Sequence, residues 1–178
     1  SKMNQINDSD YFVKLGLEKN IESGNKEDYS NLLLVSGINS YKKKEYNQAK
    51  KTLEKASKII KNHSYNSQNL AISKFYIGMS NYETNNILYL DNFKSVDSII
   101  IDTKNITSEL RNIYPKLIEY YKESGDKENQ LFYIEHLLEI DSILNRNNYS
   151  LSEEINKKYD TPILLKEKEL LISELGSK

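Results

Sequence analysis

Residues 33–56, LLVSGINSYKKKEYNQAKKTLEKA, decide the fold, because they place two helical patterns on either side of a short polar turn. In the first pattern Leu33 and Gly37 are one helical turn apart. In the second, small and apolar residues recur with the 3.6-residue period of an amphipathic helix: Ala49, Leu53 and Ala56. We therefore predict a hairpin of two α-helices in this part of the chain.

The same arrangement returns along the chain. Gly37, Gly78 and Ile118 are separated by 41 and 40 residues, and each lies in the first helix of a predicted hairpin. Tyr41 and Tyr82 keep the 41-residue step. A repeat of this length indicates an array in which each hairpin buries its faces against its neighbours. An irregular helical bundle is the alternative.

Helices are expected over most of the chain, because it holds only two prolines and six glycines and no segment alternates with the period of a strand. We predict one helical repeat domain over residues 1–178. Its expected parts are an N-terminal helix in 1–26, three repeats in 27–62, 66–102 and 106–145, and C-terminal capping helices in 150–175.

Residues that start or stop helices refine these boundaries. We expect Asp8-Ser9 to cap the first helix and Ser23-Gly24-Asn25 to end it. Pro115 either lies in the first turn of a helix that starts near Tyr114 or kinks a longer helix from Thr107, and we expect a kink or break there.

Two short helices are expected at the C-terminal end. Ser150 and Glu153 form a capping box for the first, and Tyr159-Asp160-Thr161-Pro162 ends it. The last helix then carries an apolar stripe made of Leu164, Leu171 and Leu175.

The first hairpin resembles the tetratricopeptide (TPR) pattern through six residues: Leu33, Gly37, Tyr46, Ala49, Leu53 and Ala56. In that family a small residue lets helix A lie close to helix B, and small residues on helix B let the next pair stack. The resemblance implies an all-α fold, a TPR-like right-handed superhelix of about three helical hairpins plus capping helices. The repeat is longer than the family's usual 34 residues, so longer helices or loops are expected.

Four segments resemble the TPR region of AraC-type helix-turn-helix transcriptional regulators: YYKESGD (120–126), YIEHLLEIDSIL (133–144), YDTP (159–162) and LKEKELLI (165–172). In that family the repeats are extracytoplasmic, on the periplasmic side, and precede a membrane-spanning helix and a DNA-binding domain, which are expected outside this sequence. The resemblance implies a non-catalytic, ligand- or protein-binding sensor region of a membrane-linked regulator. Sensor histidine kinases carry similar repeats. A free-standing, cytoplasmic protein–protein scaffold is the other alternative.

The concave-face positions of TPR arrays, carried onto this chain, give eight candidate binding residues: Leu34, Ile38, Tyr41, Phe75, Met79, Tyr82, Glu119 and Lys122. Apolar walls with few polar groups favour an apolar or aromatic-bearing peptide. TPR proteins that clamp a peptide's C-terminal carboxylate use Lys and Asn where this chain has apolar residues, so that activity is not expected. Most of the fourteen tyrosines are expected to serve packing.

Composition excludes several function classes. The absence of cysteine excludes disulfides, Cys-ligated zinc and iron–sulfur clusters. A net charge of −1 argues against nucleic acid as a partner. The longest apolar runs, at 32–35 and 99–101, are far shorter than the roughly 18 residues of a membrane span.

Chemistry-bearing residues are scarce and scattered. His63 and His136 are far apart, so no metal site is predicted. Glu153-Glu154 and the Glu167/Glu169 pair are interpreted as solvated charge, and Lys42-Lys43-Lys44 as a helix end that favours positive charge, with phosphate binding as the weaker alternative. We predict no enzyme activity and no cofactor, and a protein or peptide partner. Self-association into a homodimer through the terminal helices is left open.

Overall fold

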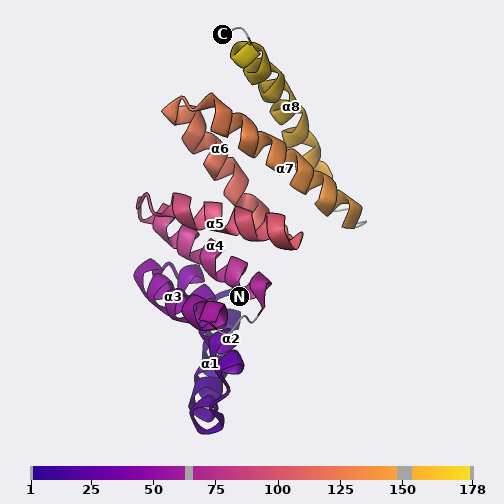
Figure 1. Ribbon diagram of the computed structural model, residues 1–178. Coiled ribbons are helices and arrows are strands. Elements are labelled where there is room, and N and C mark those ends of the chain that lie inside the picture. Colours follow the sequence, from indigo (N-terminus) through magenta and orange to yellow (C-terminus); the bar gives the residue numbers. More distant parts are fainter. Residues whose placement is uncertain (1, 63–65, 148–153, 177–178) are drawn as a thin grey trace. The chain divides into compact units, whose positions relative to one another are not determined.

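The computed structural model describes residues 2–62, 66–147 and 154–176, and all regular secondary structure in these ranges is helical (Figure 1). This confirms the predicted all-α class. The contacts divide the chain into two compact units, residues 1–105 and 106–178, which we call the N-terminal unit and the C-terminal unit. A single domain and a TPR-like superhelix over the whole chain stay predictions.

The N-terminal unit consists of five helices: α1 (Lys2–Ser23), α2 (Lys26–Lys42), α3 (Tyr46–Asn62), α4 (Ser67–Glu83) and α5 (Tyr89–Thr103). Each helix packs against the next along the chain, and α2 also contacts α4. The hairpins predicted in 27–62 and 66–102 are therefore α2/α3 and α4/α5. Contact between the first helices of successive hairpins is the neighbour packing expected of a repeat.

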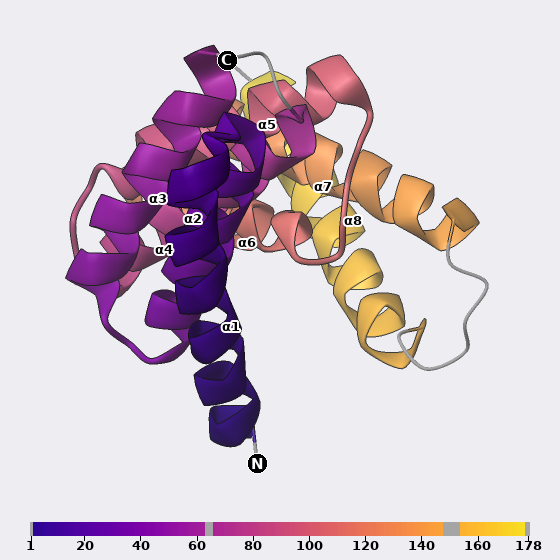
Figure 2. The same ribbon diagram turned by 90° about the horizontal axis from the view of Figure 1, so that it is seen from below.

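The C-terminal unit begins with a short 3₁₀ helix, η1 (Leu110–Asn112), followed by α6 (Ile113–Ser124), α7 (Lys127–Asn147) and α8 (Glu154–Gly176). α6 packs on α7, and α7 lies beside α8 in both views (Figure 1; Figure 2). The centre of this unit is filled by fully buried side chains: Leu110, Ile113, Tyr114, Leu117 and Ile134. The third predicted hairpin is α6/α7.

Two glycines let the helices of the first two hairpins approach closely. A Cβ placed on Gly37 would lie 2.5 Å from Leu53 Cγ, and one placed on Gly78 would lie 2.6 Å from a ring carbon of Phe93. Leu53 and Phe93 are fully buried, so neither can move aside without disturbing the core. The predicted role of a small residue in the first helix is confirmed in both hairpins. In the third, Ile118 takes this position.

The turn between the two helices is the same in all three hairpins. Lys44, Asn85 and Gly125 adopt positive φ angles of 66°, 53° and 75°. Each of their N–H groups donates to the carbonyl three residues earlier, and the next N–H donates to the carbonyl five residues before it, as in a Schellman motif. These positions are 41 and 40 residues apart, so the turns keep the period of the repeat although only the third has glycine.

The first helix does not begin where the cap signal suggested. α1 starts at Lys2, so Asp8 and Ser9 lie inside it and the predicted cap is wrong. The side chain of Asn39 on α2 donates to Ser9 Oγ (2.9 Å) and to Asp10 Oδ1 (2.8 Å), and Lys43 pairs with Asp10. These polar side chains bind a neighbouring helix instead of their own backbone. The end of α1 is as predicted, because Gly24 has a φ of +67° and Asn25 caps α2.

The C-terminal region also differs from prediction, because α8 runs unbroken through Pro162. A proline inside a helix costs about 3 kcal/mol. Contacts further along the helix offset this cost: Leu171 is buried, and Glu167, Lys168 and Glu174 pair with α6 or α7. The expected break at 159–162 is therefore wrong, and the predicted cap at Ser150 and Glu153 lies outside the described residues.

The kink or break expected at Pro115 is wrong, because α6 begins at Ile113 and runs through this proline. Residues 104–109 are not helical, η1 comes next, and Pro115 is the third residue of α6. A proline in the first turn removes no intrahelical hydrogen bond, since the N–H groups there have no carbonyl partner within the helix. Of the two alternatives, the helix that starts near Tyr114 is therefore the correct one.

The turn at Lys44 yields a test of the repeat. Replacing Lys44 with Gly should raise the free energy of unfolding by about 0.5–1 kcal/mol, because glycine adopts φ 66° without the strain of a Cβ. Urea unfolding measures this. Lys51→Gly, at an exposed position within α3, is the control and should lower stability by about 1 kcal/mol. A loss of stability in Lys44→Gly would contradict the assignment of the turn.

Candidate functional site

A groove in the C-terminal unit lies between α6, α7 and α8 and has a volume of about 600 Å³. This size is within the range of sites that bind small ligands or short peptide segments. We call it the α6–α8 groove. Its apolar lining residues are Pro115, Ile118, Leu137, Ile163 and Leu164, and its charged ones are Arg111, Glu119, Lys122, Glu123 and Glu167.

The apolar side chains that line the groove differ in how exposed they are to solvent. Leu137 and Ile118 are buried, whereas Ile163 on α8 is 65 % exposed. A ligand that covers such an exposed aliphatic side chain removes apolar surface from water, which stabilises the complex by roughly 25 cal/mol per Å². The lip formed by Ile163 is therefore a place where an apolar ligand group would bind favourably.

The groove is closed on one side by an ion pair between α6 and α8. Lys122 Nζ lies 2.7 Å from Glu167 Oε1, and the same oxygen accepts a hydrogen bond from Gln130 Nε2 on α7 at 3.0 Å. Two further pairs, Lys127–Glu174 and Lys168–Glu135, join α7 to α8 at 2.9 Å. Charged contacts thus join the helix that forms the outer wall to α6 and α7.

A buried ion pair holds another residue of the lining, Arg111. Arg111, in η1, makes two bonds to the carboxylate of Asp141 on α7, and its Nη2 lies 2.7 Å from Oδ2. Their side chains are only 12 % and 4 % exposed. Such bidentate geometry fixes the guanidinium plane, and hence this part of the lining.

Of the eight predicted binding residues, the structure brings Glu119 and Lys122 together in the α6–α8 groove. Leu34 and Phe75 are buried in the N-terminal unit and belong to its core. The others are half-buried: Ile38, Tyr41, Met79 and Tyr82. Their assignment to a concave binding face stays a prediction.

Tyrosine rings join neighbouring helices of the N-terminal unit, as expected for packing residues. The ring of Tyr41 lies 5.1 Å from that of Tyr76 and 5.6 Å from that of Tyr46, and Tyr82 lies 5.2 Å from Tyr89. The pKa of Tyr41 is raised to about 12. Burial is the largest cause, and the charge of Glu83 and the neighbouring Tyr46 add to it. This half-buried phenol is thus held in its neutral form.

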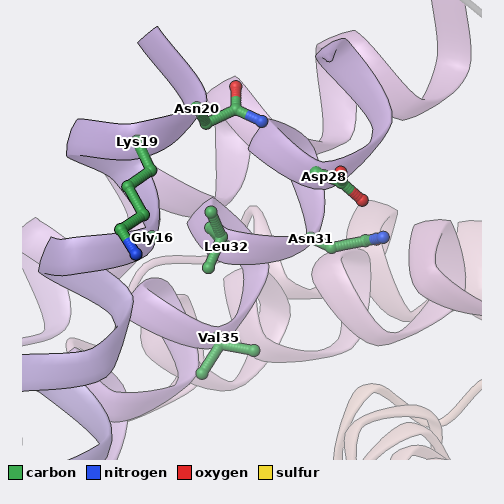
Figure 3. A pocket seen from close by; sticks show the side chains of 7 residues that line it. All are labelled: Gly16, Lys19, Asn20, Asp28, Asn31, Leu32 and Val35. Carbon is green, nitrogen blue, oxygen red and sulfur yellow. The ribbon is translucent and has the colours of Figure 1, made fainter. Parts of the chain in front are cut away.

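Two smaller cavities lie in the described part of the N-terminal unit. Figure 3 shows the first, of about 490 Å³, where Leu32 and Val35 of α2 face Gly16, Lys19 and Asn20 of α1. The second, of about 390 Å³, is lined by residues of α3, α4 and α5, among them Lys58, Lys74 and Asp91. Neither contains a predicted binding residue, and the side chain of Leu32 already fills the space beside Gly16.

The remaining chemical candidates have structural explanations. The ring centroids of His136 and Phe132 are 4.1 Å apart, so this histidine packs against an aromatic ring. His63 lies outside the described residues. Within the described ranges no cluster of His, Asp and Glu could hold a metal ion, and no helix has the length and apolarity to cross a membrane. Of the lysine triplet, Lys43 pairs with Asp10 and Lys44 forms the turn.

The sequence pattern missed most of the groove. Arg111 and Asp141 carry no motif and are 30 residues apart, and the wall residues on α8 were expected only to cap the array. The repeat did find Glu119 and Lys122, because they occupy equivalent positions on the first helix of a hairpin.

The chain matches no family model, no curated protein and no solved structure. The TPR and AraC-type resemblances therefore stay predictions.

The Arg111–Asp141 pair predicts a large stability effect. Asp141→Asn should lower the free energy of unfolding by about 3 kcal/mol, because it leaves a buried guanidinium without its counter-charge. Lys127→Gln, which breaks an exposed pair, should cost less than about 1 kcal/mol. Urea unfolding compares the two variants. Equal, small losses would show that the buried pair does not fix η1 to α7.

The shifted tyrosine predicts a pH effect. Between pH 10 and 12 the folded chain keeps the Tyr41 proton that the unfolded chain releases, so stability falls as pH rises through this window. Wild type should lose about 1 kcal/mol more than Tyr41→Phe, a value reduced because the ring is partly exposed. Denaturant unfolding across the window measures this difference. Tyr11→Phe, at an exposed ring, is the control and should behave like wild type.

Proposed function

We propose that this chain is a non-catalytic, helical-repeat binding region that takes a peptide segment of a partner protein in the α6–α8 groove. The observation that carries the proposal is the groove itself, with its apolar floor and charged sides. It has the composition of recognition sites, in which apolar area supplies affinity and a few polar groups fix orientation.

The position of α8 favours a role in signalling. This helix forms one wall of the groove and is joined to α6 and α7 by three ion pairs. A ligand that binds one placement of α8 better than another would shift the population between them. Binding in the groove would thereby change the contacts that α8 makes with other protein segments.

The wider role is proposed from the resemblance alone. The segments at 120–126, 133–144 and 159–172 support a sensor region of a membrane-linked, AraC-type transcriptional regulator, on the periplasmic side of the membrane. The sensor region of a histidine kinase and a free-standing scaffold are the alternatives. The sequence of the parent gene distinguishes the three, because the first requires a DNA-binding domain beyond these repeats, the second a kinase domain, and the scaffold neither.

Groove binding is tested with a substitution at its lip. A display library of short random peptides is selected against the full chain, and the affinities of enriched peptides are measured by fluorescence anisotropy. Ile163→Asp should weaken them by about tenfold, because it places a charge where an apolar ligand group is buried.

The matched control is Ile172→Asp, which changes an exposed isoleucine of the same helix outside the groove. It should leave the affinity within about twofold of wild type. Peptides that bind both variants and wild type equally would place binding elsewhere and refute the proposal. A library that yields no binding peptide would refute it as well.

A further inference from the structure

We infer that the α6–α8 groove recognises a cationic peptide, one in which a Lys or Arg side chain lies next to an aliphatic residue. The inference rests on the proposed function and specifies the chemistry of the partner. Its basis is the charge that remains in the groove once the internal ion pairs are counted.

Both cations that line the groove are already neutralised within the chain. Lys122 pairs with Glu167, and Arg111 makes a bidentate pair with Asp141. The charge of Glu167 is likewise used, since it accepts from both Lys122 and Gln130. A ligand therefore meets little unused positive charge here.

Two carboxylates of the lining remain. Glu119 and Glu123 are exposed, and within the described part of the chain neither makes an ion pair or a hydrogen bond. They are four residues apart on α6, so their side chains lie one turn apart on the same face of the helix. Like charges at this spacing repel each other, and a ligand cation beside them would relieve that repulsion.

The apolar part of the groove lies beside these carboxylates. Ile118 directly precedes Glu119 in α6, and Ile163 supplies an exposed aliphatic surface from α8. A peptide that buries an aliphatic side chain here would bring a neighbouring basic side chain to Glu119 and Glu123. An acidic peptide would instead meet repulsion, or would have to replace Glu167 or Asp141 in a pair that the chain already makes.

Three fluorescein-labelled peptides test the inference. All three have the sequence of one peptide selected from the display library, except at the positions beside its aliphatic residue. These positions are Lys in the first peptide, Gln in the second and Glu in the third. At low salt the Lys peptide should bind about three- to tenfold more tightly than the Gln peptide, and the Glu peptide most weakly. Raising the salt concentration should reduce the difference between Lys and Gln peptides.

The double variant Glu119→Gln/Glu123→Gln should abolish the preference for the Lys peptide. Glu128→Gln/Glu139→Gln removes the same charge from exposed positions of α7 outside the groove and should retain the preference. All four positions are on the surface, so these variants are expected to fold.

Each outcome decides a separate point. Equal binding of the Lys and Gln peptides, or tighter binding of the Glu peptide, overturns the inference. If Ile163→Asp still weakens the binding of these peptides, the proposed function stands. An equal loss of preference in both double variants overturns the inference too, since net charge and not the groove would then select the ligand. If Ile163→Asp affects none of the peptides, the proposed function fails first.

Discussion

The absence of a side chain at two positions is the constraint on which the N-terminal unit depends. Gly37 and Gly78 bring α2 against α3 and α4 against α5 so closely that a Cβ would lie 2.5–2.6 Å from a buried side chain. Leu53 and Phe93 fill the space that the glycines leave, and packing at this density is sensitive to even one added methyl group. The three equivalent turns, at Lys44, Asn85 and Gly125, recur with the same 41- and 40-residue spacing as the positions of Gly37, Gly78 and Ile118.

The C-terminal unit solves the same packing problem with different chemistry. Ile118 replaces the glycine, and the outer helix buries Leu171 and forms three ion pairs: Lys122–Glu167, Lys127–Glu174 and Lys168–Glu135. Exposed ion pairs each contribute little, about 0–1 kcal/mol, whereas the buried Arg111–Asp141 pair costs much more to break. The unit therefore combines a firmly fixed base at η1 and α7 with an outer helix held by weaker contacts, and the groove lies between the two.

Local signals predicted most of the helices because capping and helix-stopping residues act on their own backbone. The stop predicted at Ser23-Gly24-Asn25 is an example, because α1 ends at Ser23 and Asn25 caps α2. Prediction failed where a side chain had a tertiary alternative. Ser9, predicted to cap α1 together with Asp8, instead accepts a hydrogen bond from Asn39 of α2, and α8 tolerates Pro162 because its later residues pair with other helices. The TPR positions carried onto the repeat included Glu119 and Lys122 but not Arg111 or Ile163, since no repeat or local pattern states which distant elements will meet.

The contrast between the buried pair at the base and the exposed pairs of α8 explains why a ligand in the groove would affect α8 more than η1 and α7. A peptide cation beside Glu119 and Glu123 lies close to Lys122, whose partner Glu167 is on α8, whereas Arg111 is held by a carboxylate that is only 4 % exposed. A ligand changes a conformational equilibrium only by its difference in affinity for the two states. Because the exposed pairs of α8 are individually weak, a modest difference in affinity would be enough to shift that helix, while the same difference would leave the buried pair at the base unchanged. In the proposed binding mode, sensitivity to a ligand would therefore be concentrated in the wall that α8 supplies.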